Sequence, residues 1–219
     1  MTDVFEPDVP QPRAEVPRLV LASQSPARLR TLVAAGLDAE VIVSGVDESV
    51  VDASRPEKLS MVLARMKAEA VAMRLRLSDR HDDNLLVLGC DSVLFFDGEI
   101  LGKPRDAADA TERWRAMRGG EGVLHTGHCL VDLRTDKASE AAVATTVRFA
   151  DITDHEIEAY VASGEPLQVA GAFTIDGLGS AFVRSIDGDH GTVVGLSMPT
   201  LRLLLADLGV QLTDLWRLT

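Results

Sequence analysis

The sequence has few cysteines, no long apolar run and no excess of basic residues, and each shortage excludes a class of protein. Its two cysteines, Cys90 and Cys129, lie in apolar strand-like segments and predict core thiols in a reducing cytosol rather than a disulfide or metal pair. No apolar run has membrane-spanning length, and the N-terminus lacks a signal pattern, so we expect a cytoplasmic protein with no membrane partner. The net charge of −12 argues against nucleic acid as a partner, so a polyanionic ligand would need a few cations in one cleft or a metal.

The familiar catalytic and nucleotide-binding motifs are missing too. The five histidines show no ligand spacing, and no Cys/His zinc pattern exists. Neither a Walker A sequence nor a Gly-x-Gly-x-x-Gly segment follows a predicted strand. These absences favour an activated water over a protein side chain as the nucleophile.

The chain divides into a short tail and one long folded region. Prolines and acids crowd residues 1–17, which predicts a disordered tail, and residues 18–219 form one predicted domain. Strand-like runs alternate with stretches of helical periodicity, and some of the predicted strands pair antiparallel. This order predicts an α/β fold with mixed α+β character around a mixed sheet. Predicted helices cover 26–36, 56–77, 106–117, 153–164 and 199–208, and predicted strands cover 19–23, 39–44, 85–91, 93–96, 99–101, 123–133, 141–150 and 181–186.

The segment 19–28 carries the first functional signal. An apolar run of β-forming residues stops at Ser23, and Ser25 and Pro26 are typical of the N-cap and first residue of a helix. Backbone N–H groups, the positive end of the helix dipole and the Arg28 guanidinium would then converge, as in a phosphate site. The alternative is an ordinary strand-to-helix turn with a good cap.

Carboxylates follow two predicted strands. The buried run 85–91 ends in Asp91, and Asp47 and Glu48 follow the strand over 39–44. A carboxylate at a strand end can hold a metal or take a proton from water, and two such ends facing one cleft suit Mg²⁺ or Mn²⁺. The alternative for Asp91 is a structural residue that accepts hydrogen bonds from turn amides.

Two lysines and a glycine-rich cluster complete the candidates. Lys67 borders the apolar face of its helix, so its stem is expected to pack, whereas the default is an ammonium extended to solvent. Lys103 stands in Gly-Lys-Pro after a predicted hairpin, where an ordinary surface lysine is the alternative. Glycines over 163–177 suggest either a backbone approached by a ligand or plain hairpin turns.

Taken together, these segments resemble the Maf-like family of nucleoside triphosphate pyrophosphatases. The order and spacing of the matching motifs run from about Arg18 to Gly209, so the resemblance covers nearly all of the chain outside the tail. The matching motifs are 21–28 (LASQSPAR), 46–48 (VDE), 64–68 (ARMKA), 89–93 (GCDSV), 102–104 (GKP), 126–127 (TG), 164–166 (GEP), 170–173 (AGAF) and 193–196 (VVGL).

The resemblance implies an elongated two-lobed fold with a central cleft, allows for a homodimer, and implies hydrolysis of a nucleoside triphosphate to the monophosphate and pyrophosphate. Asp91 would be the proton acceptor and Glu48 and Asp91 would hold Mg²⁺ or Mn²⁺. The residues that would bind the triphosphate are Ser23, Arg28, Lys67 and Lys103.

Base preference depends on positions where the chain departs from the family. Ala27, Ser92 and Asp176 match neither the Arg, Thr and Gln of the dTTP- and UTP-preferring branch nor the Trp, Gln and Glu of the 7-methyl-GTP branch. An acid in the base site suits N–H groups of the base. Ser197 stands where a proline usually follows Gly-Leu, for which we expect a local effect only.

The expected function is therefore a metal-dependent nucleoside triphosphate pyrophosphatase, a hydrolase acting on acid anhydrides. Its substrate would be dTTP, UTP or a modified nucleotide, the last implying a house-cleaning role. The alternative from another class is a regulator of cell division or septum formation that binds nucleotide without turnover.

Overall fold

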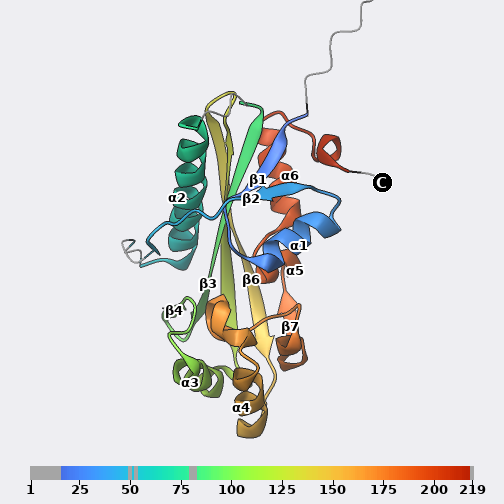
Figure 1. Ribbon diagram of the computed structural model, residues 1–219. Coiled ribbons are helices and arrows are strands. Elements are labelled where there is room, and N and C mark those ends of the chain that lie inside the picture. Colours follow the sequence, from blue (N-terminus) through green and yellow to red (C-terminus); the bar gives the residue numbers. More distant parts are fainter. Residues whose placement is uncertain (1–15, 49–50, 52–53, 79–82, 218–219) are drawn as a thin grey trace, which may run out of the picture.

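The computed structural model describes residues 16–48, 51, 54–78 and 83–217 (Figure 1). The predicted tail, residues 1–17, lies outside the described residues except for Val16 and Pro17. Among the described residues, no helix combines the length and apolarity needed to cross a membrane.

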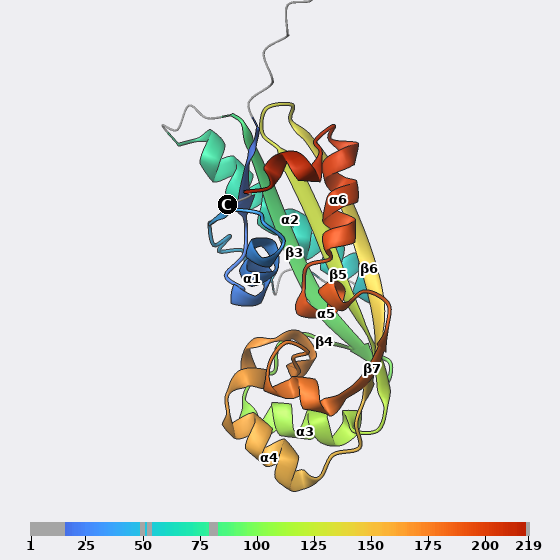
Figure 2. The same ribbon diagram turned by 90° about the vertical axis from the view of Figure 1, so that its right-hand side faces the viewer.

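The molecule is elongated, and a seven-stranded mixed sheet runs along its length (Figures 1 and 2). The strand order is β2-β1-β3-β5-β6-β7, and β4 pairs with β3 outside this path. Strand β1 is parallel to both β2 and β3, and the other pairs are antiparallel. The strands are β1 (Arg18–Leu21), β2 (Ala39–Val41), β3 (Leu85–Phe96), β4 (Glu99–Leu101), β5 (Glu121–Asp132), β6 (Lys137–Phe149) and β7 (Val183–Asp187).

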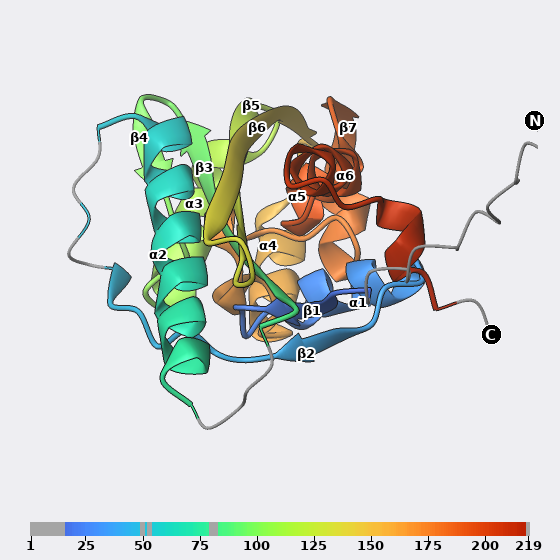
Figure 3. The ribbon, with the colours of Figure 1, turned by 90° about the horizontal axis from the view of Figure 1, so that it is seen from above.

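Helices cover both faces of the long strands and one end of the sheet. Seen from above, α2 lies on one face and α5 and α6 lie on the other (Figure 3). The α-helices are α1 (Pro26–Ala34), α2 (Pro56–Arg76), α3 (Ala107–Met117), α4 (Asp154–Ala162), α5 (His190–Val194) and α6 (Met198–Asp207). The 3-10 helices are η2 (Glu165–Gln168), η3 (Ala170–Ala172), η4 (Leu178–Phe182) and η5 (Leu212–Leu215).

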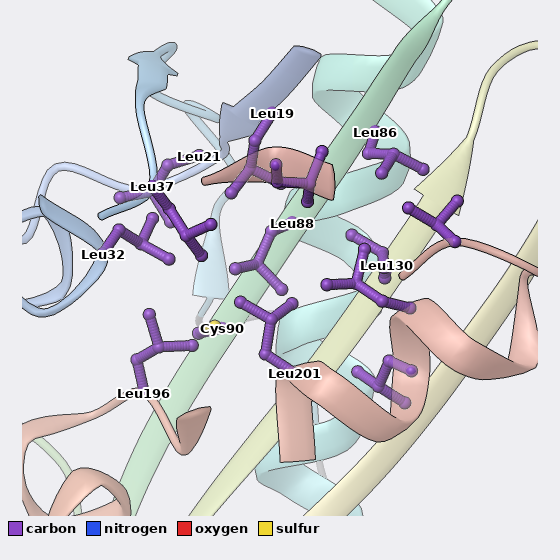
Figure 4. Close-up of a cluster of buried hydrophobic side chains, with 14 residues drawn as sticks. Leu19, Leu21, Leu32, Leu37, Leu86, Leu88, Cys90, Leu130, Leu196 and Leu201 are labelled. Carbon is purple, nitrogen blue, oxygen red and sulfur yellow. The ribbon is translucent and has the colours of Figure 1, made fainter. Parts of the chain in front are cut away.

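Buried side chains divide the molecule into two halves that share the long strands. In the first, here called the β1 half, one leucine-rich cluster packs between the sheet, α1 and α6 (Figure 4), and another packs between the sheet and α2. In the second, the Trp114 half, the ring of Trp114 makes edge contacts with Phe149, Tyr160 and Phe182. The mixed sheet and the two halves agree with the predicted fold class.

Local sequence signals are confirmed where they depend on neighbouring residues. Ser25 caps α1 with Pro26 in its first turn, and Gly36 follows the helix with a φ of 76°. Asp97 and Gly98 have φ values of 47° and 84°, as a type I′ hairpin requires. The capping box predicted for 153–164 is present at the start of α4.

The structure differs from the predicted secondary structure in three places. Strand β3 does not end at Asp91 but continues to Phe96, because β5 pairs with it along nearly its whole length. The glycine-rich cluster over 163–177 contains the 3-10 helices η2 and η3, so the alternative of plain hairpin turns is wrong. The short helix α5, which begins after its N-cap Asp189, lies in a segment for which no helix was predicted.

The prediction of core thiols is confirmed for both cysteines. Cys90 and Cys129 are buried and free. Burial raises the pKa of Cys90 to about 11 and that of Cys129 to about 12, so both thiols are protonated at neutral pH.

Candidate active site

The candidate site lies at an interruption in the pairing of β3. Leu88 is the last residue of β3 that pairs with β1, and Leu94 is the first that pairs with β4. Between them, this edge of β3 has no strand neighbour in the described chain, although the other edge stays paired with β5. Asp91 and Ser92 lie in this interval. The interruption arises because β1 ends at Leu21, whereas β3 continues to Phe96.

Alternation along β3 sends Asp91 and Ser92 to opposite faces of the sheet. Asp91 points to the face covered by α2, where its carboxylate meets Lys67, and Ser92 points to the face of α1, where it meets Arg28. The two faces therefore supply separate charged groups on either side of this unpaired interval, here called the open edge of β3.

Two glycines allow α2 to approach the sheet closely enough to bring Lys67 to Asp91. A Cβ on Gly89 would lie 2.2 Å from the carbonyl oxygen of Ala64, and one on Gly127 would lie 2.3 Å from that of Ser60. Gly89 precedes Asp91 by two residues on the same face, and Gly127 pairs with Asp91 across β5. Any side chain at these positions would push the helix away from the carboxylate.

Lys67 bridges two carboxylates. Its Nζ lies 2.6 Å from Oδ1 of Asp91 and 2.6 Å from Oε1 of Glu48. Lys67 and Asp91 are both buried, whereas the side chain of Glu48 is half exposed. Burial raises the pKa of Asp91 above its usual range, and the positive charges of Lys67 and Arg28 oppose this rise. A carboxyl group with a raised pKa is better suited to accept a proton than an exposed one.

The acidic residues of the site could supply some of the ligands of a metal ion, with the substrate and water supplying the others. The described residues contain no group of three or more His, Cys, Asp or Glu side chains that could enclose an ion. Glu48 and Asp91 each keep a second carboxylate oxygen beyond the one that Lys67 contacts. Mg²⁺ commonly binds one or two carboxylates and takes its other ligands from substrate phosphates and water, so this pair fits such an ion.

Arg28 is fixed by three hydrogen bonds on the other face of the sheet. Its Nε donates to the carbonyl oxygen of Gly195 at 2.8 Å, Nη1 to Ser23 Oγ at 3.1 Å, and Nη2 to Ser92 Oγ at 3.2 Å. A guanidinium has five N–H groups, so two remain for which the described residues provide no acceptor. A buried, oriented cation with two N–H donors to spare can bind an anion.

A chain of hydroxyls sets the hydrogen-bonding character of Ser92. Thr126 donates its only hydroxyl proton to the carbonyl oxygen of Thr192 at 2.8 Å. In the 2.8 Å contact between the hydroxyls of Ser92 and Thr126, Ser92 is therefore the donor. Because Ser92 also accepts from Arg28, it presents only a lone pair to a ligand.

Sequence reasoning matched Thr126 and Gly195 to motifs but assigned them no role. Gly195 has a φ of 108°, and a Cβ there would lie 3.1 Å from Arg28 Nε, so this position needs glycine to seat the guanidinium. The signal was present in the segments 126–127 and 193–196. Their function depends on pairing between residues far apart in the chain.

Of the predicted base-selecting residues, Ser92 hydrogen-bonds to Arg28, whereas no side-chain hydrogen bond or ion pair joins Ala27, Asp176 or Lys103 to Arg28 or Lys67 in the described chain. Ala27 is half-buried on α1. Asp176 lies between η3 and η4 and forms an ion pair with Arg30 at 3.1 Å. Lys103 is exposed on the loop after β4, and no hydrogen bond or ion pair joins it to any other described residue. Its phosphate-binding role stays a prediction.

Ser197 connects the start of α6 to a buried histidine on β5. Its hydroxyl caps α6, and its N–H donates to Nε2 of His128 at 3.0 Å. The neutral imidazole therefore carries its proton on Nδ1. Burial lowers the pKa of His128 to about 4, and the charge of Arg28 contributes. A proline at 197 has no N–H to donate, which gives this departure from the family pattern a structural consequence.

Comparison with known proteins places these motifs in one family. The family model described as Maf-like protein matches residues 18–208. A protein from Salinispora tropica is 61% identical over 91% of this chain and 87% of its own length. Proteins from Streptomyces coelicolor and Nostoc punctiforme are 57% and 47% identical, over 94% and 93% of this chain and 97% and 100% of their own lengths. All three are named nucleoside triphosphate pyrophosphatase. The chain, matched over most of its length, belongs to the Maf-like protein family.

Proposed function

We infer that this protein is a nucleoside triphosphate pyrophosphatase, which uses water to convert a nucleoside triphosphate to the monophosphate and pyrophosphate. The observation that carries this inference is the buried Asp91 carboxylate, held 2.6 Å from Lys67 beside the fixed Arg28 at the open edge of β3. The relatives described above bear the name of this enzyme. No observation favours the alternative of a regulator that binds nucleotide without turnover.

Asp91 is the general base of the proposed reaction. Its carboxylate takes a proton from the attacking water, the bond between the α and β phosphates breaks, and pyrophosphate leaves. Burial raises the pKa of Asp91, which increases its affinity for that proton, while the positive charge of Lys67 opposes this rise. Phosphoryl transfer needs charge neutralisation and positioning more than a covalent nucleophile, which agrees with the side chains present.

Three cations neutralise the triphosphate. Arg28 offers the two N–H groups that its own contacts leave over, and the hydroxyl of Ser23 keeps the guanidinium in place. Lys67 reaches the phosphates from the α2 face, and Lys103 reaches them from the loop after β4. Because Lys67 already bridges Glu48 and Asp91, a bound phosphate would share its ammonium with these carboxylates.

Glu48 and Asp91 would hold a divalent cation, Mg²⁺ or Mn²⁺, together with the substrate. Such an ion, when bound, supplies charge neutralisation at the phosphates and lowers the pKa of a bound water. Their second carboxylate oxygens are the groups available for it.

The experiment that tests the proposed function is release of pyrophosphate from a panel of triphosphates by the purified protein with Mg²⁺ or Mn²⁺. The panel includes ATP, GTP, CTP, UTP, dTTP and methylated or deaminated analogues, because Ala27, Ser92 and Asp176 are proposed to select the base. Binding without release of pyrophosphate from any member would contradict the enzyme and favour the regulator. A preference for analogues would identify a house-cleaning enzyme.

Location and assembly complete the proposal. Two free, buried thiols are consistent with a cytoplasmic protein. The homodimer that the family resemblance allows is tested by light scattering on the purified chain.

A further inference from the structure

One ion pair joins the two halves of the molecule. Nη2 of Arg30 lies 3.1 Å from Oδ2 of Asp176, although 146 residues separate them. Arg30 belongs to α1, whose leucines pack in the β1 half, and Asp176 lies between η3 and η4, which pack in the Trp114 half. Figures 1 and 2 both show α1 at the end of the β1 half nearer to the Trp114 half.

The turn that carries Asp176 is anchored on both sides by one carboxylate. Glu165 accepts hydrogen bonds from the hydroxyl of Thr174 and from the backbone N–H groups of Leu178 and Gly179, the last two at 2.9 Å. Asp176 lies between these anchors, so its backbone is fixed. These anchors do not orient the side chain of Asp176. In the described chain, the side chain that contacts its carboxylate is that of Arg30.

Arg30 lies on α1, the helix that also carries Arg28. Arg30 follows Ala27 by three residues, so both lie on one side of α1, whereas Arg28 faces Gly195 and Ser92. The ion pair therefore holds Asp176 no farther from α1, the helix that carries Arg28, than the length of one arginine side chain.

The chemistry of these groups indicates what they would recognise. The Asp176 carboxylate can only accept hydrogen bonds, and Arg30 uses one of its oxygens, so the other remains available. The Ser92 hydroxyl, which donates to Thr126 and accepts from Arg28, also presents only a lone pair. A nucleobase edge with N–H donors complements each of these acceptors, whereas an edge of acceptors does not.

The pair is too exposed to matter much for stability. The side chains of Arg30 and Asp176 are 66% and 29% exposed, and exposed pairs stabilise folded proteins little. Orientation of Asp176 is a role that such a pair can fulfil. Resting on the proposed function, we propose that Arg30 is a positioning residue for base selection, which holds Asp176 so that it accepts a hydrogen bond from an N–H group of the base.

The test compares Arg30→Ala with the wild type on ATP, GTP, CTP, UTP and dTTP, and on methyl triphosphate, which has no base. We expect the ratio of kcat/KM between the best and worst base to fall about tenfold, since a hydrogen bond to a charged group is lost. The change lies in KM, while kcat and the hydrolysis of methyl triphosphate stay within about twofold, because Asp91, Lys67 and Arg28 are untouched. Arg30→Lys restores part of the preference.

Two further variants separate positioning from other roles. If Arg30 acts through Asp176, the double variant Arg30→Ala/Asp176→Asn has the base preference of Asp176→Asn alone. Arg76→Ala removes an exposed arginine that pairs with Asp136 at the far end of α2 and serves as the control, with unchanged preference.

Three results are distinguishable. An unchanged base preference in Arg30→Ala overturns the positioning role. An equal loss on all substrates, methyl triphosphate included, also overturns it and indicates that Arg30 binds phosphate. A wild-type protein that hydrolyses no triphosphate instead refutes the proposed function, and the role of Arg30 falls with it.

Discussion

A fall in pH is expected to destabilise this protein through one buried imidazole, His128. The folded-state pKa of about 4 lies below the ordinary value of 6.5, chiefly because of burial and then because of the charge of Arg28. Between these two values the unfolded chain binds more protons than the folded one, so the free energy of unfolding falls as the pH falls. The stability associated with neutral His128 is complete above the ordinary pKa and is lost progressively toward the folded-state value.

The magnitude follows from the two pKa values. From about pH 7.5 to about pH 4.5, this single group should remove roughly 2.5 kcal/mol from the free energy of unfolding. The loss has a structural basis, because Nε2 accepts the N–H of Ser197 at the start of α6 and cannot do so when protonated.

Urea unfolding at several pH values, for the wild type and for His128→Gln, measures this effect. Glutamine keeps an acceptor for the N–H of Ser197 but does not titrate, so the variant lacks the histidine's share of the pH dependence while keeping that of the carboxylates. If both proteins lose the same free energy of unfolding over this range, the reasoning about His128 is refuted.

Two glycine substitutions test how the site is held. Gly127→Ala is expected to destabilise the fold by about 2 kcal/mol or more, because its Cβ would lie 2.3 Å from the carbonyl oxygen of Ser60 and would push α2 outward. Gly102→Ala, which meets nothing within 4 Å, is the control in the same denaturation experiment and should change stability by less than about 0.5 kcal/mol. Gly195→Ala is expected to raise KM for the triphosphate about fivefold, since a strained residue at a φ of 108° would crowd Arg28. A KM equal to that of the wild type in steady-state kinetics would show that Gly195 does not seat this arginine.

Much of the fold could be predicted because its signals are local. The cap at Ser25, the turn at Asp97-Gly98 and the capping box at Thr153 each involve residues within four positions of one another. Periodic apolar residues identified α2 as well, because a long amphipathic pattern is hard to mistake.

The parts that were missed depend on pairing between distant segments. The sequence around Asp91 resembles a strand end, but β5 pairs with β3 beyond it. The length of that pairing depends on both strands together and cannot be predicted from either one alone. Similarly, the hydroxyl chain from Ser92 through Thr126 to Thr192 joins three elements. The ion pair between Arg30 and Asp176 crosses between the two halves.

The candidate site was predicted in part. Asp91 and Glu48 both contact Lys67, and Ser23 accepts a hydrogen bond from Arg28 on the other face, while the roles of these residues stay predictions. The sequence did not reveal that the pairing of β3 is interrupted between Leu88 and Leu94, beside both groups.

The measurement that tests the central claim most directly is the rate of pyrophosphate release by Asp91→Asn. The claim is that Asp91, held by Lys67 at the open edge of β3, accepts a proton from the attacking water. Asparagine has nearly the same shape but cannot take that proton, so kcat should fall by about 100-fold or more while nucleotide binding and the folded circular dichroism spectrum remain. Asp132→Asn changes another buried acid, at the far end of β5, and should keep the wild-type rate. A folded Asp91→Asn protein that releases pyrophosphate at more than about a tenth of the wild-type rate would contradict the account.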